Sequence, residues 1–596
     1  MSKNILVAVA WPYANSHIHV GNITGSYLPA DIFARYHRLI GNRVLMVSGS
    51  DAHGTPVTVR ADAENSPPSD VYQKYHVGFL DLFQKLGLTY DLFTSTHTEN
   101  HFKVSQAMFL ALNKNGYLYT ESNLQWYAPA QSRFLPDRYI EGTCYICGYG
   151  NARGDQCDNC GNLLDATQLI DPRSKIDGTT PVLHETTHFF LDLGKLQSEI
   201  VDFLRARESY WRPNVLRQSL GQILANDLHG RAITRDLDWG IPVPVEGWEG
   251  KCLYVWFEAV IGYLSAAIEW SFIAAQSDAW KAWWNDPSAQ AYYFIGKDNI
   301  PFHAVIWPAQ LVGAGEWFNH IFEEQEGSLL TLPYQVPANE FMNLEGKKIS
   351  GSRNWAVWGL DFLSRYDPDT LRYYLTANMP ESKDTDWDWQ DFLNRNNNEL
   401  VATWGNLANR VLSFAYKHWQ GRVPEPGELR PADHQILAIV EAGFEQVSAH
   451  IEAVRLRAAL FEAMALATEV NRYLDTAAPW FEIKQDKSVA ATTIYTALRA
   501  IDSLKILFSP FLPFTSERLH FYLGYTQPIF GEQFVETQRD SLGDHHVLRY
   551  RPGNGCGSWE PSKLAAGQLL GQPAPLFRKL DDSIVIEERA RMGAST

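Results

Sequence analysis

The sequence has few cysteines, no excess of positive charge and no long apolar run. Six cysteines in 596 residues are too few for a disulfide scaffold. The formal net charge of −17 excludes a protein that coats nucleic acid through its overall field, although a local basic patch is still allowed. No stretch reaches the roughly 18–20 apolar residues that a membrane helix needs. The apolar run at residues 5–10 has no small-residue cleavage site after it, so it predicts a strand and not a signal peptide. We expect a cytoplasmic protein that does not bind membranes.

The length and the apolar patterns predict several domains, because 596 residues exceed what one hydrophobic core supports. Residues 1–117 alternate strands with helices, which is typical of a parallel sheet. The pattern becomes irregular near residue 118 and resumes near residue 251. Long amphipathic stretches such as 399–417 and 453–475 then predict a helical bundle. The fold class is therefore α/β, with a parallel sheet split by an insertion and followed by an α-helical domain.

One junction between a strand and a helix predicts an anion site. The strand at residues 5–10 ends in the polar segment 11–16, and His19, Gly21 and Asn22 then begin a stretch with helical apolar spacing. Ligands bind where the strands of an open α/β sheet end, and a helix start favours phosphate. Gly21 lets a ligand pass close to the backbone.

Residues 344–354 form a second candidate phosphate segment. Its glycines, hydroxyls and cations suit a polyphosphate, but taken alone the segment is equally compatible with a solvated turn. It does not follow the P-loop pattern, because Lys348 stands where that pattern has Ser or Thr.

Four of the six cysteines predict a metal site. Cys144 and Cys147 form one C-x2-C pair and Cys157 and Cys160 form another, nine residues later. Four thiolates close a tetrahedral site and leave no position for water, so we expect one structural Zn²⁺ and no catalytic metal at this site. A pair of redox CxxC motifs is the weaker alternative.

Together these segments resemble a known family. His19-Val20-Gly21-Asn22 resembles the HIGH motif of the class I aminoacyl-tRNA synthetases, and Lys348-Ile349-Ser350-Gly351-Ser352 resembles their KMSKS loop; we call residues 344–354 the KMSKS-like loop. Within that class the chain resembles the methionyl-tRNA synthetase family. Further matches over residues 1 to about 485 are 12–15, 50–56, 254–259, 262–263, 296–298, 302–303, 406–410, 479–480 and the four-cysteine insertion.

The resemblance implies a division of the chain. It predicts a Rossmann-like catalytic domain in two halves (1–117 and 236–325), a connective insertion with a zinc knuckle (118–235), a region with the KMSKS-like loop and stem contacts (326–385), a helical anticodon-binding domain (386–545) and an unassigned tail (546–596).

The resemblance also implies a reaction. Methionine attacks the α-phosphate of ATP, which is bound with Mg²⁺, and the methionyl group then passes from the adenylate to tRNA(Met). His19, Asn22, Lys348 and Arg353 are the implied catalytic residues. The implied ATP contacts are His19, Gly21, Asn22, Gly296, Asp298, Lys348, Ser350 and Ser352. Many relatives have a second histidine where this chain has Asn22, so we expect hydrogen bonding without a cation at that position.

One position departs from the family pattern. The family motif usually has a second lysine where this chain has Gly351, and either Arg353 or Lys347 can supply the missing cation. A charge-assisted contact of this kind is worth about 1.5–3 kcal/mol.

Methionine and the anticodon have their own implied residues. A flexible thioether needs an aromatic-lined pocket, and the matching positions are Trp11, Tyr13, Trp256, Tyr263, Phe302 and His303, with Asp51 for the ammonium group. Trp11 replaces an aliphatic residue of many relatives. Asn406, Arg410 and Trp480 match anticodon contacts, with the tryptophan as a stacking platform.

Three other functions compete with this interpretation. Another aminoacyl-tRNA synthetase of the large aliphatic group would carry a much larger editing insertion than residues 118–250 supply. A non-catalytic RNA-binding protein would explain Gly351 but not the retained His19, Lys348 and Asp51. A generic nucleotidyltransferase does not need the helical domain. No extra dimerisation domain is evident, so we expect a monomer.

Overall fold

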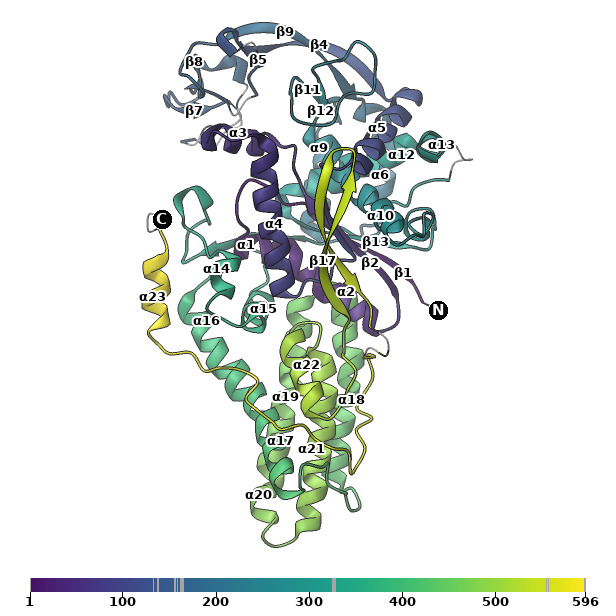
Figure 1. The fold of residues 1–596 in the computed structure, drawn as a ribbon, viewed down its shortest axis with the longest axis vertical. Helices are drawn as coiled ribbons and strands as arrows, with labels where there is room; N and C mark the ends of the chain where they lie inside the picture. The colour runs from purple at the N-terminus through teal and green to yellow at the C-terminus, as the bar shows by residue number, and fades with distance from the viewer. Residues whose placement is uncertain are drawn as a thin grey trace.

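The structure is a computed structural model, and it describes residues 2–131, 133–136, 139–154, 157, 159–160, 164, 166–323, 328–553, 555 and 557–593. Its centre is a seven-stranded sheet (Figure 1). In sheet order the strands are β14 (Ala338–Asn339), β13 (Gln290–Gly296), β1 (Asn4–Val9), β2 (Arg43–Ser50), β3 (Leu92–Ser95), β18 (Gly543–Arg551) and β17 (Glu532–Asp540). The five strands from β14 to β3 are parallel to one another, whereas β18 pairs antiparallel to β3.

The parallel strands are buried on both faces, which explains why β1 reads as a continuous apolar run. Ile5, Val7 and Val9 pack into one hydrophobic core, whereas Leu6 and Ala8 pack into the other. Because successive strand side chains alternate between faces, β1 separates two cores. Helices α2 (Leu28–Leu39), α4 (Pro68–Leu86) and α15 (Pro368–Ala377) contribute to the first core, and α5 (Glu99–Lys114), α10 (Gly262–Ile273) and α12 (Trp307–Ala314) contribute to the second.

The insertion forms two small antiparallel sheets at one end of the molecule (Figure 1). The long strands β4 (Leu118–Ala128) and β9 (Val182–Leu191) pair over ten residue positions, flanked by β5 (Arg133–Phe134) and β10 (Arg231–Ala232). A second sheet of β6 (Ile140–Thr143), β7 (Ala152–Arg153) and β8 (Ile170–Ser174) lies next to the four cysteines. Helices α6 (Gln197–Arg205), α7 (Pro213–Gln218) and α8 (Leu220–Ala225) lead back, and β11 (Thr234–Arg235) pairs with β12 (Cys252–Leu253).

Shorter elements complete the catalytic part. These are α1 (Val20–Asn22), a π-helical turn Ile23–Tyr27, α3 (Thr55–Glu64), α9 (Val255–Glu258), α11 (Lys281–Trp284), α13 (Trp317–Glu323), β15 (Met342–Leu344), α14 (Gly359–Leu363) and β16 (Thr385–Trp387). β15 pairs in parallel with β16, so the KMSKS-like loop begins directly after a paired strand.

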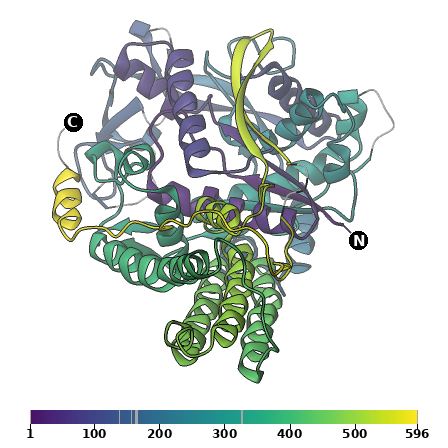
Figure 2. The same cartoon turned by 60° about the horizontal axis from the view of Figure 1, so that its bottom comes forward.

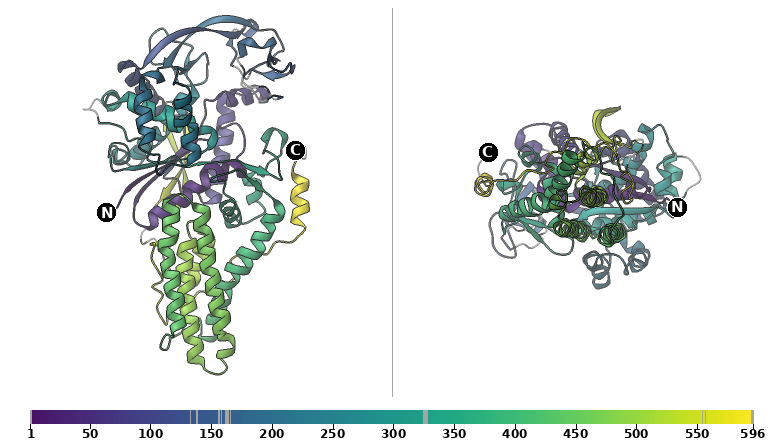
Figure 3. Two further views of the ribbon diagram at one scale, coloured as in Figure 1. Left: turned by 180° about the vertical axis from the view of Figure 1, so that it is seen from behind. Right: turned by 90° about the horizontal axis from the view of Figure 1, so that it is seen from below.

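The helical domain extends away from the sheet, as Figure 3 shows from behind. It contains α16 (Trp389–Arg395), a π-helical segment Asn396–Gly405, α17 (Asn406–His418), α18 (Pro431–Glu452), α19 (Leu456–Ala477), α20 (Pro479–Glu482), α21 (Lys487–Phe508) and α22 (Pro513–Tyr522). The two amphipathic stretches predicted as helices are confirmed, because they correspond to the π-segment with α17 and to α19. In the described ranges no helix combines the length and apolarity needed to cross a bilayer.

The structure differs from the sequence prediction at residues 532–551. These residues were expected to end the helical domain and begin the tail, but they form the hairpin β17–β18, which adds to the edge of the catalytic sheet. Residues 532–540 do not alternate cleanly, because Gln533, Val535 and Thr537 lie on one strand face and mix polar with apolar side chains, so no period-2 signal reveals the hairpin. Residues after 557 then run along the helical domain and end in α23 (Ile584–Arg591), which Figure 2 shows beside α16.

Candidate active site and metal centre

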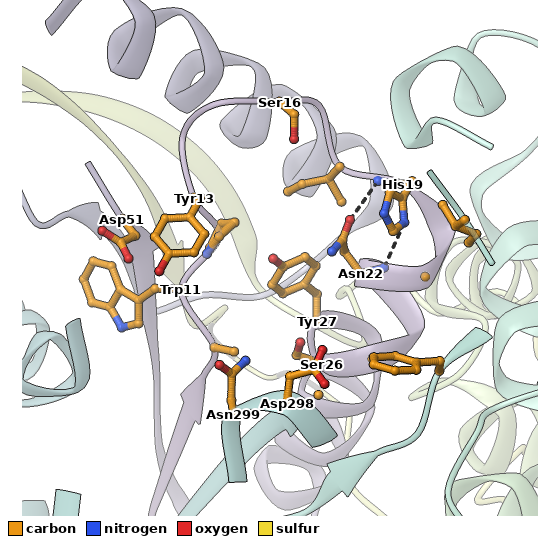
Figure 4. Close-up of a pocket in the computed structure, with 18 of the residues that line it drawn as sticks. Trp11, Tyr13, Ser16, His19, Asn22, Ser26, Tyr27, Asp51, Asp298 and Asn299 are labelled. Carbon is orange, nitrogen blue, oxygen red and sulfur yellow. Dashed lines mark hydrogen bonds between the residues drawn. The ribbon is translucent and has the colours of Figure 1, made fainter. Parts of the chain in front are cut away.

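A cavity of about 450 Å³ opens where the parallel strands end. Its floor follows β1 at Ala10–Trp11, β2 at Asp51 and β13 at Gly296, which is the edge where an open α/β sheet binds ligands. The cavity gathers most of the predicted ATP and methionine residues: Trp11, Tyr13, His19, Gly21, Asn22, Asp51, Trp256, Tyr263, Gly296, Asp298, Phe302, His303 and Lys348. Figure 4 shows Trp11, Tyr13, Asp51, His19, Asn22 and Asp298 around this cavity.

His19 and Asn22 hold each other at the start of α1. The backbone N–H of His19 donates to Asn22 Oδ1 (3.2 Å), and the backbone N–H of Asn22 donates to His19 Nδ1 (3.4 Å; Figure 4). Nδ1 is therefore the acceptor nitrogen, so Nε2 carries the proton. Burial lowers the pKa of His19 to about 4, which keeps the imidazole neutral. The pair presents a neutral N–H donor and an amide at a helix start.

The KMSKS-like loop reaches the cavity through Lys348, which is exposed and lines it. Trp358, just after the loop, lies 6.0 Å from the His19 ring and forms an antiparallel bridge with that residue. A Cβ on Gly351 would come within 3.2 Å of Trp358. The loop is thus packed beside His19, with its lysine facing the cavity.

Of the predicted loop residues that the structure describes, Ser350 and Arg353 do not line the cavity. Ser350 exchanges backbone hydrogen bonds with Trp355 (2.9 and 3.0 Å), and Arg353 is exposed. Ser352 is described only as part of the turn Gly351–Arg353, and its side chain lies outside the described part of the structure. The predicted roles of all three stay predictions.

The cavity side at β13 contains groups that the sequence analysis did not select. Lys297 is paired with Glu340 (2.7 Å) and Asp384 (2.8 Å), next to Asp298. Burial raises the pKa of Asp298, although the lysines at 348 and 297 oppose the shift. Glu340 and Ser26 also line the cavity. Nothing in the local sequence around these residues indicates that they lie at this side of the cavity.

Aromatic side chains line the opposite side of the cavity. Trp256 Nε1 donates to Tyr13 Oη (2.5 Å), and its ring lies 4.7 Å from that of Phe302. The Tyr263 hydroxyl lies 2.7 Å from His303 Nε2, and His303 Nδ1 lies 2.9 Å from the Asn299 carbonyl. A carbonyl only accepts, so Nδ1–H donates to it and Nε2 accepts from the tyrosine.

Asp51 and Trp11 leave polar atoms unpaired in this pocket. Asp51 Oδ1 and Trp11 Nε1 are buried without a hydrogen-bond partner in the described structure. Burial, and then the nearby Glu258 carboxylate, raise the pKa of Asp51 well above its usual range. An unpaired oxygen and a raised pKa are what a buried carboxyl group shows when no cation is paired with it. The Glu258 carboxylate is hydrogen-bonded to His53 (2.8 Å) and His101 (2.7 Å), which forms a network behind the pocket. The matched motifs include His53 and Glu258, but they did not indicate that the two residues are in contact.

The four cysteines come together as predicted. Their Sγ atoms all lie within 4.8 Å of one another, with 4.0 Å between Cys144 and Cys160 and 3.6 Å between Cys147 and Cys157. Four sulfurs about 2.3 Å from one tetrahedral ion lie about 3.8 Å apart, so the spacing fits a metal ion.

The three predicted anticodon residues lie together in the helical domain. The Arg410 guanidinium carbon lies 4.6 Å from the centre of the Trp480 ring, and Arg410 also bonds Asn471 (3.1 Å). Asn406 is exposed one helical turn before Arg410 on α17. Asn406 and Arg410 lie on α17 and Trp480 on α20, two helices of the domain that extends away from the sheet (Figure 1).

Comparisons with known proteins match both the catalytic and the helical part of the chain. A family model described as tRNA synthetases class I (M) matches residues 5–412, and one described as the anticodon binding domain of methionyl tRNA ligase matches residues 423–544. The chain is 54% identical to a methionine–tRNA ligase of Thermomicrobium roseum over 598 aligned residues, covering 100% of each chain. It is 53% identical to one from a Roseiflexus species, covering 100% of this chain and 99% of the relative.

A solved structure shares the fold. The Mycobacterium tuberculosis methionyl-tRNA synthetase bound by methionyl-adenylate matches with a TM-score of 0.73 at 24% identity, covering 97% of this chain and 100% of that one. The likeness confirms the predicted fold class of an α/β catalytic domain with an insertion and a helical domain.

Proposed function

We infer the function of this chain from its family: the chain belongs to the class I tRNA synthetases of the methionyl group and has their anticodon-binding domain. It attaches L-methionine to tRNA at the expense of ATP. The methionine carboxylate attacks the α-phosphorus, pyrophosphate leaves, and a tRNA ribose hydroxyl then displaces AMP from the methionyl-adenylate.

One observation carries this proposal. A single cavity joins an aromatic pocket, where Asp51 is buried with one oxygen unpaired, to a helix start beside Lys348. The aromatic pocket with Asp51 fits an amino acid that has an uncharged thioether side chain and an ammonium group. The helix start beside Lys348 fits a nucleoside triphosphate. The carboxylate of one substrate and the α-phosphate of the other then meet between them, so positioning supplies much of the catalysis.

We propose that His19 and Asn22 stabilise charge on the phosphates. His19 donates from Nε2, because Asn22 N–H occupies Nδ1. Asn22 accepts from the His19 backbone through Oδ1 and keeps its amide N–H groups for a phosphate oxygen. Both donors are fixed before ATP arrives, which is the condition for electrostatic stabilisation of a transition state. Lys348, Ser350 and Ser352 close over the β- and γ-phosphates, and Asp298 beside Gly296 holds the ribose. Mg²⁺ enters with ATP as its counter-ion.

On the methionine side, Asp51 pairs with the ammonium group and so satisfies its unpaired oxygen. Trp11, Tyr13, Trp256, Phe302, Tyr263 and His303 surround the thioether side chain. Tyr263 donates to His303, which fixes the direction of its hydroxyl.

We propose Zn²⁺ as the ion of the four-cysteine cluster. Thiolate sulfur in a closed tetrahedral set favours zinc, and no open position is left for catalysis. Cys144, Cys147, Cys157 and Cys160 hold it and so fix the small sheet β6–β7–β8 of the insertion.

We propose that Asn406, Arg410 and Trp480 read the anticodon of tRNA(Met) by stacking and hydrogen bonds to single-stranded bases. The predicted division of the chain into domains is retained, except that the hairpin β17–β18 is assigned to the catalytic sheet. The cytoplasmic location and the monomeric state stay predictions; mass photometry of the purified chain checks the second.

The direct test is amino-acid-dependent exchange between ATP and pyrophosphate, run with each standard amino acid separately. We expect exchange with methionine alone and charging of a tRNA(Met) transcript. Exchange with another amino acid overturns the pocket assignment but keeps the enzyme class. No exchange with any amino acid, from folded and zinc-loaded protein, favours a non-catalytic RNA-binding protein.

A further inference from the structure

Helix α23 lies against the catalytic part of the molecule although it follows the helical domain in sequence (Figures 1 and 3). Its inner face is buried, with Ile584 and Val585 at 8% and 6% exposure, whereas Ile586 on the outer face is 76% exposed. The helix is therefore docked and not free in solvent. No sequence motif assigned a role to residues 546–596.

The first contact of α23 is with the start of the KMSKS-like loop. Arg589 bonds the Glu345 carboxylate through Nε (3.1 Å) and Nη2 (3.0 Å), and Nη2 also lies 3.4 Å from Asp388. Glu345 accepts a further bond from the backbone N–H of Trp389 (3.0 Å). Glu345 has a φ of 48°, which non-glycine residues adopt only when contacts hold them there.

The second contact is with the end of the same loop. The backbone N–H of Gly593 donates to the carbonyl of Asn354 (3.1 Å). Asn354 also has a left-handed backbone, with a φ of 49°. The chain at 589–593 therefore connects both ends of the loop and leaves its tip exposed, with Lys348 lining the cavity.

The third contact fixes the helix after the loop. The Glu588 carboxylate is 3% exposed and bonds Arg365 twice (2.8 and 2.9 Å), and Tyr366 Oη donates to it (2.9 Å). Arg365 and Tyr366 follow α14, which begins after Trp358, the residue that packs on His19. A bidentate pair on a buried carboxylate has one geometry, so it fixes α23 relative to the end of α14.

The segment before α23 is fixed to the helical domain. Leu580 and Asn397 bond each other (both 2.9 Å), and Asn396 donates to the carbonyl of Arg578 (3.1 Å). Both asparagines belong to the π-helical segment that leads into α17. Residues 578–593 thus link the helix that carries Asn406 and Arg410 to the KMSKS-like loop.

We propose that Glu588 and Arg589 are positioning residues that hold the KMSKS-like loop at its working distance from ATP. The proposal rests on the proposed function for its chemistry, since the loop is the ATP side of the cavity. Arg589 acts on the loop directly through Glu345. Glu588 acts through Arg365 by holding α23 in place.

Amide hydrogen exchange tests whether Arg589 holds the KMSKS-like loop, without any assay of activity. We expect residues 345–354 to exchange faster in Arg589→Ala than in the wild type, and Arg589→Lys to restore part of the protection. Lys579→Ala, which removes an exposed cation of the same segment, is the matched control and should leave the loop unchanged. Equal exchange of this loop in Arg589→Ala and wild type overturns the proposal.

Kinetics test the consequence for the reaction. In methionine-dependent pyrophosphate exchange we expect Arg589→Ala to raise the KM for ATP about two- to fivefold, the range of a partly exposed charge pair. The KM for methionine should stay within about twofold, because the residues that Glu588 and Arg589 are shown to bond do not line the cavity. Equal changes in both KM values indicate a general structural effect and contradict the proposal.

Glu588→Gln supplies a second variant at the buried pair. We expect it to raise the KM for ATP further than Arg589→Ala while circular dichroism shows an intact fold; if it unfolds, Arg589→Ala decides alone. A wild-type protein that shows no methionine-dependent pyrophosphate exchange refutes the proposed function. The amide hydrogen exchange of residues 345–354 still decides whether Arg589 holds the loop.

Discussion

At the scale of residues, the carboxylate of Asp51 makes the most specific demand on a ligand. It is buried with one oxygen unpaired, and burial together with Glu258 raises its pKa. We expect Asp51→Asn to raise the KM for methionine about 10- to 100-fold, the loss of one charge-assisted contact, with the KM for ATP unchanged. In the wild type the KM for methionine should rise as pH falls through the raised pKa, because only the ionised carboxyl pairs with an ammonium group. Normal methionine affinity in the Asp51→Asn enzyme would contradict this role.

His19 makes a different prediction about pH. Its pKa is lowered by burial to about 4, so the imidazole stays neutral at every pH above that value. We expect His19→Ala to slow exchange about 100-fold or more at saturating substrates, the usual cost of removing one fixed donor. The wild-type rate should not fall on account of His19 until the pH approaches 4. A wild-type acid limb near the ordinary histidine pKa of about 6.5 that disappears in His19→Ala would show that the residue works as a cation.

At the scale of elements, the KMSKS-like loop lacks a lysine at Gly351 and has two exposed cations nearby, Lys347 and Arg353. Neither lines the cavity in the present conformation. If the loop closes over pyrophosphate, the residue that replaces the missing lysine should slow adenylate formation about tenfold or more when changed to alanine. Single-turnover rates of Arg353→Ala and Lys347→Ala, measured side by side, identify it; unchanged rates in both would mean that Gly351 is tolerated without compensation.

The hairpin β17–β18 is held to the sheet in a pH-dependent way. Burial alone lowers the pKa of His545, but the Glu269 carboxylate at 3.0 Å, followed by Asp540 and Asp544, raises it above the usual value. A raised pKa gives stability that is complete below the unfolded value of about 6.5 and is lost as pH rises through the folded value. We expect the melting temperature to fall across that window in the wild type and to change less in His545→Ala. The exposed His434→Ala is the control, and an identical profile in all three proteins would contradict the prediction.

The sequence revealed those elements whose signal is local. The strand at Ile5–Val9, the turn at His19–Asn22 and the paired cysteines were readable because period, helix start and ligand spacing lie within a few residues. The hairpin was missed because residues 532–540 have no clear alternation of polar and apolar residues, and the preceding helices favoured a helical continuation. The contacts of Glu258 with His53 and His101, and of Arg589 with Glu345, were not readable, since each joins segments that only the folded chain brings together.

At the scale of the whole molecule, the cavity and the surface with Asn406, Arg410 and Trp480 lie in different domains. Amino-acid activation and tRNA binding should therefore respond to different substitutions. We expect Trp480→Ala to raise the KM for tRNA about 5- to 100-fold, the value of one base stacked on an aromatic ring, and Trp480→Phe to retain most of the affinity. Methionine-dependent pyrophosphate exchange, which needs no tRNA contact at this surface, should be unchanged in both. Phe461→Ala removes another exposed aromatic ring from α19 and should alter neither reaction. Because residues 578–593 connect the two domains, a double variant of Trp480→Ala with Arg589→Ala measures their coupling: independent sites multiply their effects on aminoacylation, whereas sites coupled through the tail give a smaller combined loss.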